Sequence, residues 1–228
     1  MAMMEEVLNY KFKNENILLT ALTHSSYANE SRAEGVVCNE RLEFLGDAVL
    51  GFVIGSYLYK TFPELSEGKL TKLRASVVCE QMLAKKAKAL GVPQYLRLGK
   101  GEELTGGRER VSILEDTFES IIGAIYLDGG VEEATKFILG QLKEEIEKIK
   151  ASQHVLDNKT SLQEVLQRTS QAPIEYIVVG ESGPAHNKVF KVEVKHNGTV
   201  LGYGKGKSKK EAEQHAAQVA LERLGVKI

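Results

Sequence analysis

The residues best suited to chemistry in this sequence are acids that share one face of a predicted helix, in the stretch NERLEFLGDAVL. At about 100° per residue, Glu40, Glu43 and Asp47 fall inside an arc of roughly 60°. Like charges three and four residues apart repel one another, and no basic residue follows on this arc. Such a face favours a bound cation, and carboxylate oxygens suit a hard divalent metal. The opposite face is apolar and predicts core packing through Leu42, Leu45, Val49 and Phe52.

A second predicted helix, in SILEDTFESIIGAIYLDGG, repeats this arrangement. Asp116 and Glu119 are spaced i, i+3 and share a face. One acidic face is usually just solvated, but two core-packed helices that both carry one can bring four carboxylates together. We therefore expect Glu43, Asp47, Asp116 and Glu119 to form a metal site for phosphate chemistry. The apolar face of this second helix comprises Leu114, Phe118, Ile121 and Ile125.

The chain has 228 residues, of which 43% are hydrophobic, so it can bury a real core and form two domains. We find no apolar export segment near the N-terminus and no uninterrupted apolar span of about 18 residues. We therefore expect a cytoplasmic protein with no membrane partner. Cys38 and Cys79 form no pattern, and we expect free thiols without an assigned function.

Charge is distributed unevenly along the chain, although the formal net charge is only −1. Residues 158–228 hold 11 Lys and Arg against 7 Asp and Glu, whereas residues 1–157 hold 19 against 24. An acidic front joined to a basic tail suits a catalytic domain with a polyanion-binding appendage, because phosphate contacts dominate nucleic-acid affinity.

The pattern of elements changes near residue 150. Residues 1–150 read as an all-α domain, in which the Gly-rich stretch 99–111 is interpreted as a flexible connection. Residues 151–158 read as a polar, aperiodic linker. The pattern of residues 159–228 then predicts a small α+β domain whose elements follow the order αβββα. Its first helix should start with a capping box at Thr160 and Gln163, and Asn197-Gly198 should form a hairpin turn.

The last predicted helix has a small-residue face for close packing on the sheet, formed by Ala212, Ala216, Ala220 and Leu224. In the first domain, His24 lies in THSSY, at the end of a predicted helix. We interpret His24 as hydrogen-bonded structure, and a catalytic role is the alternative.

These motifs resemble those of ribonuclease III. The stretch NERLEFLGDAVL closely resembles the signature of that family. SEGKLTKLRA, GGRERVSILEDTFES and IIGAIYLDGG resemble the neighbouring family blocks in the same order. The tail from about Thr160 to Leu224 resembles a double-stranded-RNA-binding domain. The resemblance covers nearly the whole chain.

The resemblance implies a homodimeric endonuclease, paired through its nuclease domain, that cuts both strands of RNA duplexes. The expected products carry 5′-phosphate and 3′-hydroxyl ends with short 3′ overhangs, and the expected substrates include ribosomal RNA precursors and messenger RNA. Mg²⁺ is the expected metal, Mn²⁺ could replace it, and no organic cofactor is expected.

Matched by motif position, the family's carboxylates correspond to particular residues here. Glu43, Asp47, Asp116 and Glu119 match its metal-binding and catalytic acids, and Asp47 with Glu119 is our expected catalytic pair. Two further acids, Glu40 and Glu67, match positions in a catalytic valley near the dimer interface. Where many relatives have a small residue, this chain has Glu115. At about 100° from Asp116, we expect Glu115 to point away from the metal.

The resemblance also implies the RNA-binding residues of the tail. Gln163 and His186 stand where family members contact minor grooves. Lys207, Lys209 and Lys210 open the last helix, whose N-terminus already favours phosphate.

Three other readings compete with this one. The main alternative is a non-catalytic scaffold that binds double-stranded RNA, but a scaffold has no use for a costly carboxylate cluster. A hydrolase of small phosphates would have no use for the basic tail. A di-iron bundle would need Glu-x-x-His pairs, which neither acidic helix contains.

Overall fold

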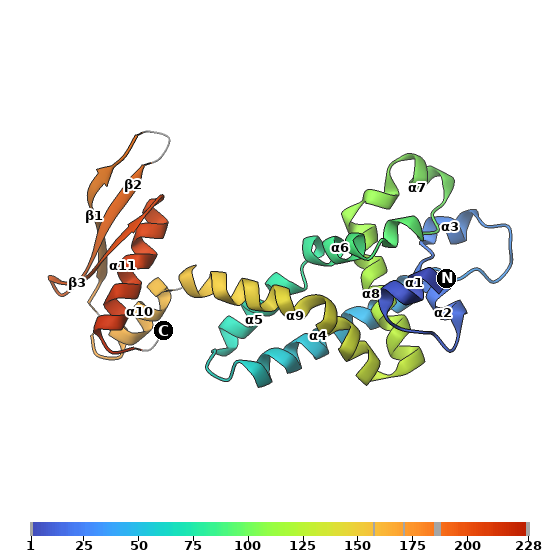
Figure 1. Ribbon diagram of the computed structural model, residues 1–228, viewed down its shortest axis with the longest axis horizontal. Helices are drawn as coiled ribbons and strands as arrows, with labels where there is room; N and C mark the ends of the chain where they lie inside the picture. Colours follow the sequence, from blue (N-terminus) through green and yellow to red (C-terminus); the bar gives the residue numbers. More distant parts are fainter. Residues whose placement is uncertain (1, 157, 171, 185–187, 227–228) are drawn as a thin grey trace. The chain divides into compact units, whose positions relative to one another are not determined.

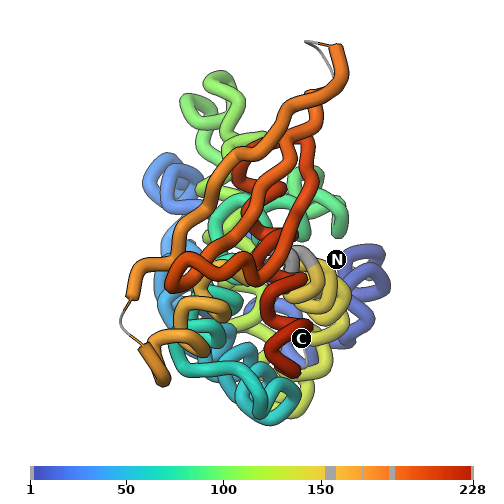
Figure 2. Tube along the Cα trace, turned by 90° about the vertical axis from the view of Figure 1, so that its left-hand side faces the viewer, coloured from blue at the N-terminus to red at the C-terminus, as the bar shows by residue number. Residues whose placement is uncertain are grey.

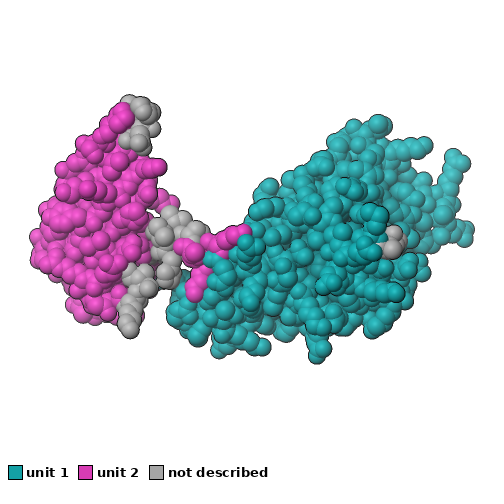
Figure 3. Space-filling model, in the orientation of Figure 1, with its two compact units in different colours: residues 1–147 teal, residues 148–228 magenta. Residues whose placement is uncertain are grey.

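The computed structural model describes residues 2–156, 158–170, 172–184 and 188–226. These divide into two compact units, residues 1–147 and 148–228, shown in different colours in Figure 3. Each unit has its own core, and each is described by itself.

The first unit is built from helices, as predicted. Their bounds are Ala2–Leu8 (α1), Glu15–Ala21 (α2), Ser25–Glu30 (α3), Glu40–Thr61 (α4), Glu67–Val77 (α5), Glu80–Ala89 (α6), Val92–Gln94 (η1), Lys100–Leu104 (α7), Gly107–Glu109 (η2), Val111–Gly129 (α8) and Val131–Leu156 (α9), whose last residues belong to the second unit. In this part of the described chain, extended pairing is limited to a single bridge between Thr23 and Arg97. Figure 1 shows α4 and α8 within this helical unit.

The core of the first unit lies where α4 packs on α8. The predicted apolar face of α8 is fully buried, because Leu114, Phe118 and Ile121 are each 0% exposed. The two helices approach so closely that a Cβ on Gly46 would overlap the carbonyl of Glu119. A Cβ on Gly123 would likewise overlap the carbonyl of Leu42. Glycine at both positions therefore lets the two backbones touch.

The prediction for α4 was wrong at Phe52, which is 63% exposed rather than buried. Phe44 and Tyr59 on the same helix are also exposed, at 80% and 74%. In the described part of the chain, α4 is the one helix whose length and apolar composition would allow it to cross a membrane. It also begins with Glu40 and Glu43 and packs on α8, as a core helix does.

Residues 99–111 do not form the expected flexible connection, because they contain α7 and η2. The Glu30 carboxylate accepts hydrogen bonds from the Lys100 amide (2.8 Å) and the Gly101 amide (3.4 Å) at the start of α7. The Arg108 guanidinium pairs with Glu103 (2.6 Å) and also donates to backbone carbonyls of residues 93 and 96. Contacts distant in sequence therefore order this stretch, which has too little periodicity to be recognised.

The second unit has the predicted αβββα order. Its elements are Asn158–Gln167 (α10), Ile174–Ser182 (β1), Val189–His196 (β2), Thr199–Gly206 (β3) and Lys209–Arg223 (α11). The strands form an antiparallel sheet of order β1-β2-β3, and Figure 2 shows them side by side. Asn197 and Gly198 have φ values of 51° and 74°, the positive angles that a tight hairpin turn requires.

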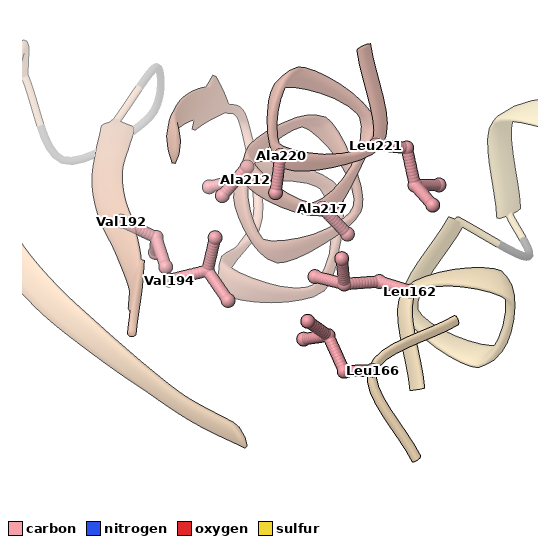
Figure 4. Packing of buried hydrophobic residues seen from close by; sticks show 9 residues of the cluster. Leu162, Leu166, Val192, Val194, Ala212, Ala217, Ala220 and Leu221 are labelled. Carbon is pink, nitrogen blue, oxygen red and sulfur yellow. The ribbon is translucent and has the colours of Figure 1, made fainter. Parts of the chain in front are cut away.

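The core of the second unit lies between the sheet and its two helices. Figure 4 shows Val192 and Val194 of β2 pointing toward Leu162 and Leu166 of α10 and toward residues of α11. The small-residue face of α11 is confirmed at Ala212, Ala216 and Ala220, which are all 0% exposed. These alanines pack on glycines of β3 at positions 202, 204 and 206, where a Cβ would meet the helix backbone. The expectation fails only at Leu224, which caps the helix and is 42% exposed.

Two predicted boundaries differ from the structure. Helix α9 continues to Leu156, so residues 151–156 are helical rather than aperiodic. Helix α10 begins at Asn158, two residues before the predicted capping box. The buried side-chain amide of Asn158 donates to the backbone carbonyl of Gln214 (3.3 Å). The backbone amide of Lys159 donates to the side-chain oxygen Oε1 of Gln214 (3.1 Å). A buried tertiary contact with α11 therefore fixes this helix start.

Because the α4–α8 crossing has no room for a side chain, we predict that Gly46→Ala lowers the free energy of unfolding by about 1–3 kcal/mol, as overpacking does. Cleavage activity should fall with it, since Asp47 is the next residue. The matched control is Gly140→Ala on α9, where a Cβ would meet nothing within 4 Å. It should stabilise the helix by up to about 1 kcal/mol. Urea unfolding measures the free energy of unfolding of both variants. Equal effects in the two variants would contradict the close backbone contact between α4 and α8.

Candidate active site

The contact between α4 and α8 brings together the two predicted acidic faces. Asp47 directly follows Gly46, whose backbone touches the carbonyl of Glu119. The start of α4 is tied to α8 by a second contact, in which Ser120 Oγ donates to the Asn39 carbonyl (3.2 Å). Asn39 occupies the predicted N-cap position, although its side chain makes no capping hydrogen bond. Contacts to the backbone of α4 and its N-cap therefore set the spacing of the acids.

Glu119 is the most strongly perturbed of these acids. Glu119 is 8% exposed, and its pKa is raised from 4.5 to about 8. Burial is the largest cause, and negative charge on Asp47, Glu115, Glu43 and Asp116 adds to it. Mutual repulsion of this kind requires the carboxylates to be close to one another.

Glu43 and Asp116 show the same environment. The pKa of Glu43 is raised by burial, then by the charges of Asp116, Glu40 and Asp47. The pKa of Asp116 is raised by burial and by nearby acids, although His24 opposes the shift. The structure thus gathers all four predicted carboxylates, with Glu40 beside them.

Glu67 does not join this cluster within one chain. It lies exposed at the start of α5, where it accepts a hydrogen bond from Thr71 Oγ1 at 2.9 Å. In the described part of the chain, Glu67 is not among the charges that shift the pKa of Glu43, Asp116 or Glu119.

Glu115, which was expected to point away from the metal, lies within electrostatic range of the cluster. Burial raises its pKa first, and the charges of Asp116, Glu80, Glu43 and Asp47 raise it further. The helical signal was available in the sequence, because Glu115 and Glu119 are spaced i, i+4 and lie on one face. Glu80 was also missed, since it starts a separate helix, α6, and belongs to no acidic stripe.

The chemistry of the donor set fits a divalent metal. It consists of carboxylate oxygens, partly shielded from water, whose charges raise one another's pKa values. Hard cations such as Mg²⁺ and Mn²⁺ prefer such oxygens. Over the part of the chain that is described, no three His, Cys, Asp or Glu side chains converge on a single point as ligands do. The described acids therefore lie near one another without converging on a common point.

The predicted RNA-binding lysines lie around the N-terminus of α11. Lys207, Lys209 and Lys210 are all exposed. Ser208 caps the helix by accepting from the Glu211 amide (3.2 Å), and the Glu211 carboxylate accepts from the Lys207 amide (2.7 Å). These two hydrogen bonds fix the backbone from Lys207 to Glu211, the segment that carries the three lysines.

The other two predicted RNA contacts are on different elements. Gln163 is exposed on α10 and lines a cavity of about 450 Å³ together with Lys159, Thr160 and Tyr176. His186 lies outside the described residues. Cys38 and Cys79 are free thiols, as expected.

Comparison with known proteins identifies both units. Residues 14–146 match the family described as Ribonuclease-III-like, and residues 159–224 match the double-stranded RNA binding motif. The chain is 51% identical over 221 residues to Ribonuclease 3 of Geobacillus kaustophilus (strain HTA426), covering 97% of this chain and 89% of that protein. It is 51% identical over 223 residues to Ribonuclease 3 of Caldanaerobacter subterraneus subsp. tengcongensis, covering 98% and 97% respectively.

A solved structure agrees for the first unit. The nuclease domain of ribonuclease III from Campylobacter jejuni is 44% identical, with a TM-score of 0.58, and the match covers 62% of this chain and 95% of that one. A nuclease domain of this type joined to a double-stranded-RNA-binding motif defines an endoribonuclease that acts on double-stranded RNA. The chain belongs to the ribonuclease III family, whose members are generally metal-dependent, and the scaffold alternative is not favoured.

The raised pKa of Glu119 predicts a pH-dependent cost to the metal-free fold. Because the folded-state pKa of about 8 exceeds the ordinary 4.5, the folded protein holds this proton more tightly than the unfolded chain. Glu119 therefore favours the fold below about pH 4.5, and this contribution is lost as the pH rises to about 8. In a chelator, Glu119→Gln should match the wild-type Tm near about pH 5 and exceed it near about pH 9.

The control for this experiment is Glu132→Gln, because Glu132 is an exposed acid in the first turn of α9. Its Tm should follow that of the wild type across the pH range. Scanning calorimetry of the three proteins measures the differences, and a constant offset for Glu119→Gln would contradict the assigned cause.

Proposed function

We propose that the chain hydrolyses both strands of RNA duplexes with a divalent metal held by Glu43, Asp47, Asp116 and Glu119. The products would carry 5′-phosphate and 3′-hydroxyl ends with short 3′ overhangs. The observation that carries this proposal is the buried Glu119, whose pKa is raised to about 8 by burial and by neighbouring acids. A fold has no structural reason to bury an acid among acids, but a cation would offset the repulsion.

Asp47 and Glu119 are the proposed catalytic pair, and their environments differ. Asp47 is exposed, so RNA can reach it, whereas Glu119 lies in the buried stretch 117–125 of α8. Both would hold the metal, Mg²⁺ or Mn²⁺, which when bound lowers the pKa of a coordinated water and stabilises the leaving oxygen. Glu40 is close enough to repel Glu43 and Asp116, and it would add negative charge at the edge of the site.

We propose that a second copy of the chain covers the exposed apolar face of α4. Phe44, Phe52 and Tyr59 are spaced by eight and seven residues, so they lie within one arc of the helix. Three exposed aromatic residues on one face are typical of an interface. The similar nuclease domain from Campylobacter jejuni is described as having structural flexibility in a region involved in dimer formation. In such a dimer Glu67 would lie in a valley near the interface, as its motif position implies.

The second unit would bind duplex RNA by shape, through contacts with 2′-hydroxyls and phosphates. Lys207, Lys209 and Lys210 are proposed for the phosphates, and Gln163 and His186 for the minor grooves. The proposed substrates are structured transcripts in the cytoplasm, including ribosomal RNA precursors and messenger RNA.

For the nuclease site, we predict that Asp47→Asn abolishes measurable cleavage of a long RNA duplex but leaves duplex affinity unchanged. The physical reason is that a neutral amide binds a hard cation more weakly than a charged carboxylate does, whereas RNA binding depends on the second unit. Gel analysis with and without Mg²⁺, beside single-stranded RNA and a DNA duplex of the same sequence, measures the activity. Glu132→Gln is the charge-matched control. Full activity in Asp47→Asn would remove that residue from the site, and binding without cutting in either metal by the wild type would support a scaffold.

For RNA binding, we predict that Lys209→Ala with Lys210→Ala weakens binding to every duplex sequence alike. The slope of log affinity against log salt should become shallower by about two, because two phosphate contacts are lost. Lys195→Ala is the control, since its ammonium group pairs with Glu193 (2.7 Å). Fluorescence anisotropy at several salt concentrations measures both quantities, and an unaltered slope would rule out phosphate contacts by these lysines.

For the dimer, we predict that Phe52→Asp shifts the protein to a monomer, because a buried, unpaired carboxylate opposes association. Leu104→Asp is the control, because Leu104 is 87% exposed and belongs to a different helix, α7. Sedimentation equilibrium measures the molar mass. A Phe52→Asp variant that remains a dimer would place the interface elsewhere.

A further inference from the structure

His24 belongs to a segment that is fixed against the start of α4. The His24 amide donates to the Arg97 carbonyl (3.1 Å), beside the bridge between Thr23 and Arg97. The Thr23 carbonyl accepts from the Asn39 amide (2.9 Å), and Asn39 immediately precedes Glu40. His24 is thus held by backbone hydrogen bonds next to the acidic face.

Hydrogen bonds to Ser26 fix the tautomer of the imidazole. The Ser26 amide donates to His24 Nδ1 (3.2 Å), so this nitrogen carries the lone pair. Ser26 Oγ accepts from the Gly99 amide (2.9 Å), which leaves its own proton to donate to Nδ1 across 2.8 Å. Both contacts place the ring proton of the neutral imidazole on Nε2.

The segment of His24 reaches the acidic cluster through Asn39, whose amide donates to the Thr23 carbonyl (2.9 Å) and whose carbonyl accepts from Ser120 Oγ (3.2 Å), next to Glu119. The ring is also within electrostatic range of Asp116, because its protonated form lowers the pKa of that carboxyl against the effects of burial and of two nearby glutamates. No described residue hydrogen-bonds to Nε2, because the hydrogen bonds of the ring are those of Nδ1. A half-buried donor at the edge of the acidic cluster therefore has its hydrogen-bonding capacity unused.

The tautomer of His24 determines which kind of ligand its Nε2 can bind. A protonated Nε2 has no lone pair, so in this tautomer it cannot coordinate a metal. It can donate to an anionic oxygen, and a phosphodiester supplies such oxygens wherever RNA meets the carboxylate site.

We propose that His24 is a further catalytic residue of the nuclease site, donating a hydrogen bond from Nε2 to a phosphate oxygen of bound RNA beside Asp116. This inference rests on the carboxylate site proposed above. It also means that the hydrogen bonds to Ser26 serve to orient the ring, in addition to capping α3.

Two amide substitutions separate contact with RNA from the structural role. In His24→Asn, the short side chain can still accept from the Ser26 amide, since Asn is a favoured N-cap, but it cannot reach the position of Nε2. In His24→Gln, the longer amide can place a donor near that position, although it caps the helix poorly. His24→Asn therefore retains the helix-capping role of His24, and His24→Gln retains the hydrogen-bond donor.

The experiment measures single-turnover cleavage of an RNA duplex in saturating Mg²⁺, with Tm and duplex affinity measured alongside. His24→Asn should reduce the cleavage rate by about a hundredfold, as loss of one donor to a reacting oxyanion does, with Tm and affinity unchanged. His24→Gln should recover most of that loss despite its poorer cap.

The inference is overturned if His24→Asn cleaves at the wild-type rate, or if both variants lose activity only in proportion to a lowered Tm. Wild-type cleavage and its loss in Asp47→Asn, measured in the same assay, test the carboxylate site independently. A failure of the His24 inference is therefore distinguishable from a failure of the proposed function.

Discussion

The contact between the backbones of α4 and α8 is the constraint on which the nuclease unit depends. Gly46 and Gly123 leave no space for a side chain, so the crossing point of the two helices is fixed by backbone atoms rather than by adjustable rotamers. Asp47 and Glu119 lie at this point, so the crossing sets the distance between them. A site that must hold reacting groups within a fraction of an ångström gains from such rigid support.

The same crossing gathers acids that repel one another. Glu119 is nine-tenths buried, and its neighbours Glu115, Asp47, Glu43 and Asp116 all carry like charge when ionised. Burial of the apolar residues of α4 and α8 opposes this repulsion, and α8 is buried along most of its length. The fold accepts an unfavourable interaction at the position of the proposed metal site.

Periodicity made much of this structure predictable, and its limits follow from the same cause. The acidic faces of α4 and α8 and the αβββα order were correctly predicted because each rests on a local repeat. Phe52 was misassigned because an exposed apolar residue can have the same sequence pattern as one in the core. Helix α7 and the start of α10 were missed because they depend on the distant residues Glu30 and Gln214, which no local pattern reveals.

The glycine and alanine contact between β3 and α11 bears on how this sequence can change over time. Where large side chains meet, as at Leu162 and Leu166, one apolar residue can replace another by repacking. Gly202, Gly204 and Gly206 allow no such exchange, because the backbone of α11 occupies the space that any Cβ would need. Sequence drift in the RNA-binding unit should therefore spare these three positions, while the rest of its core varies.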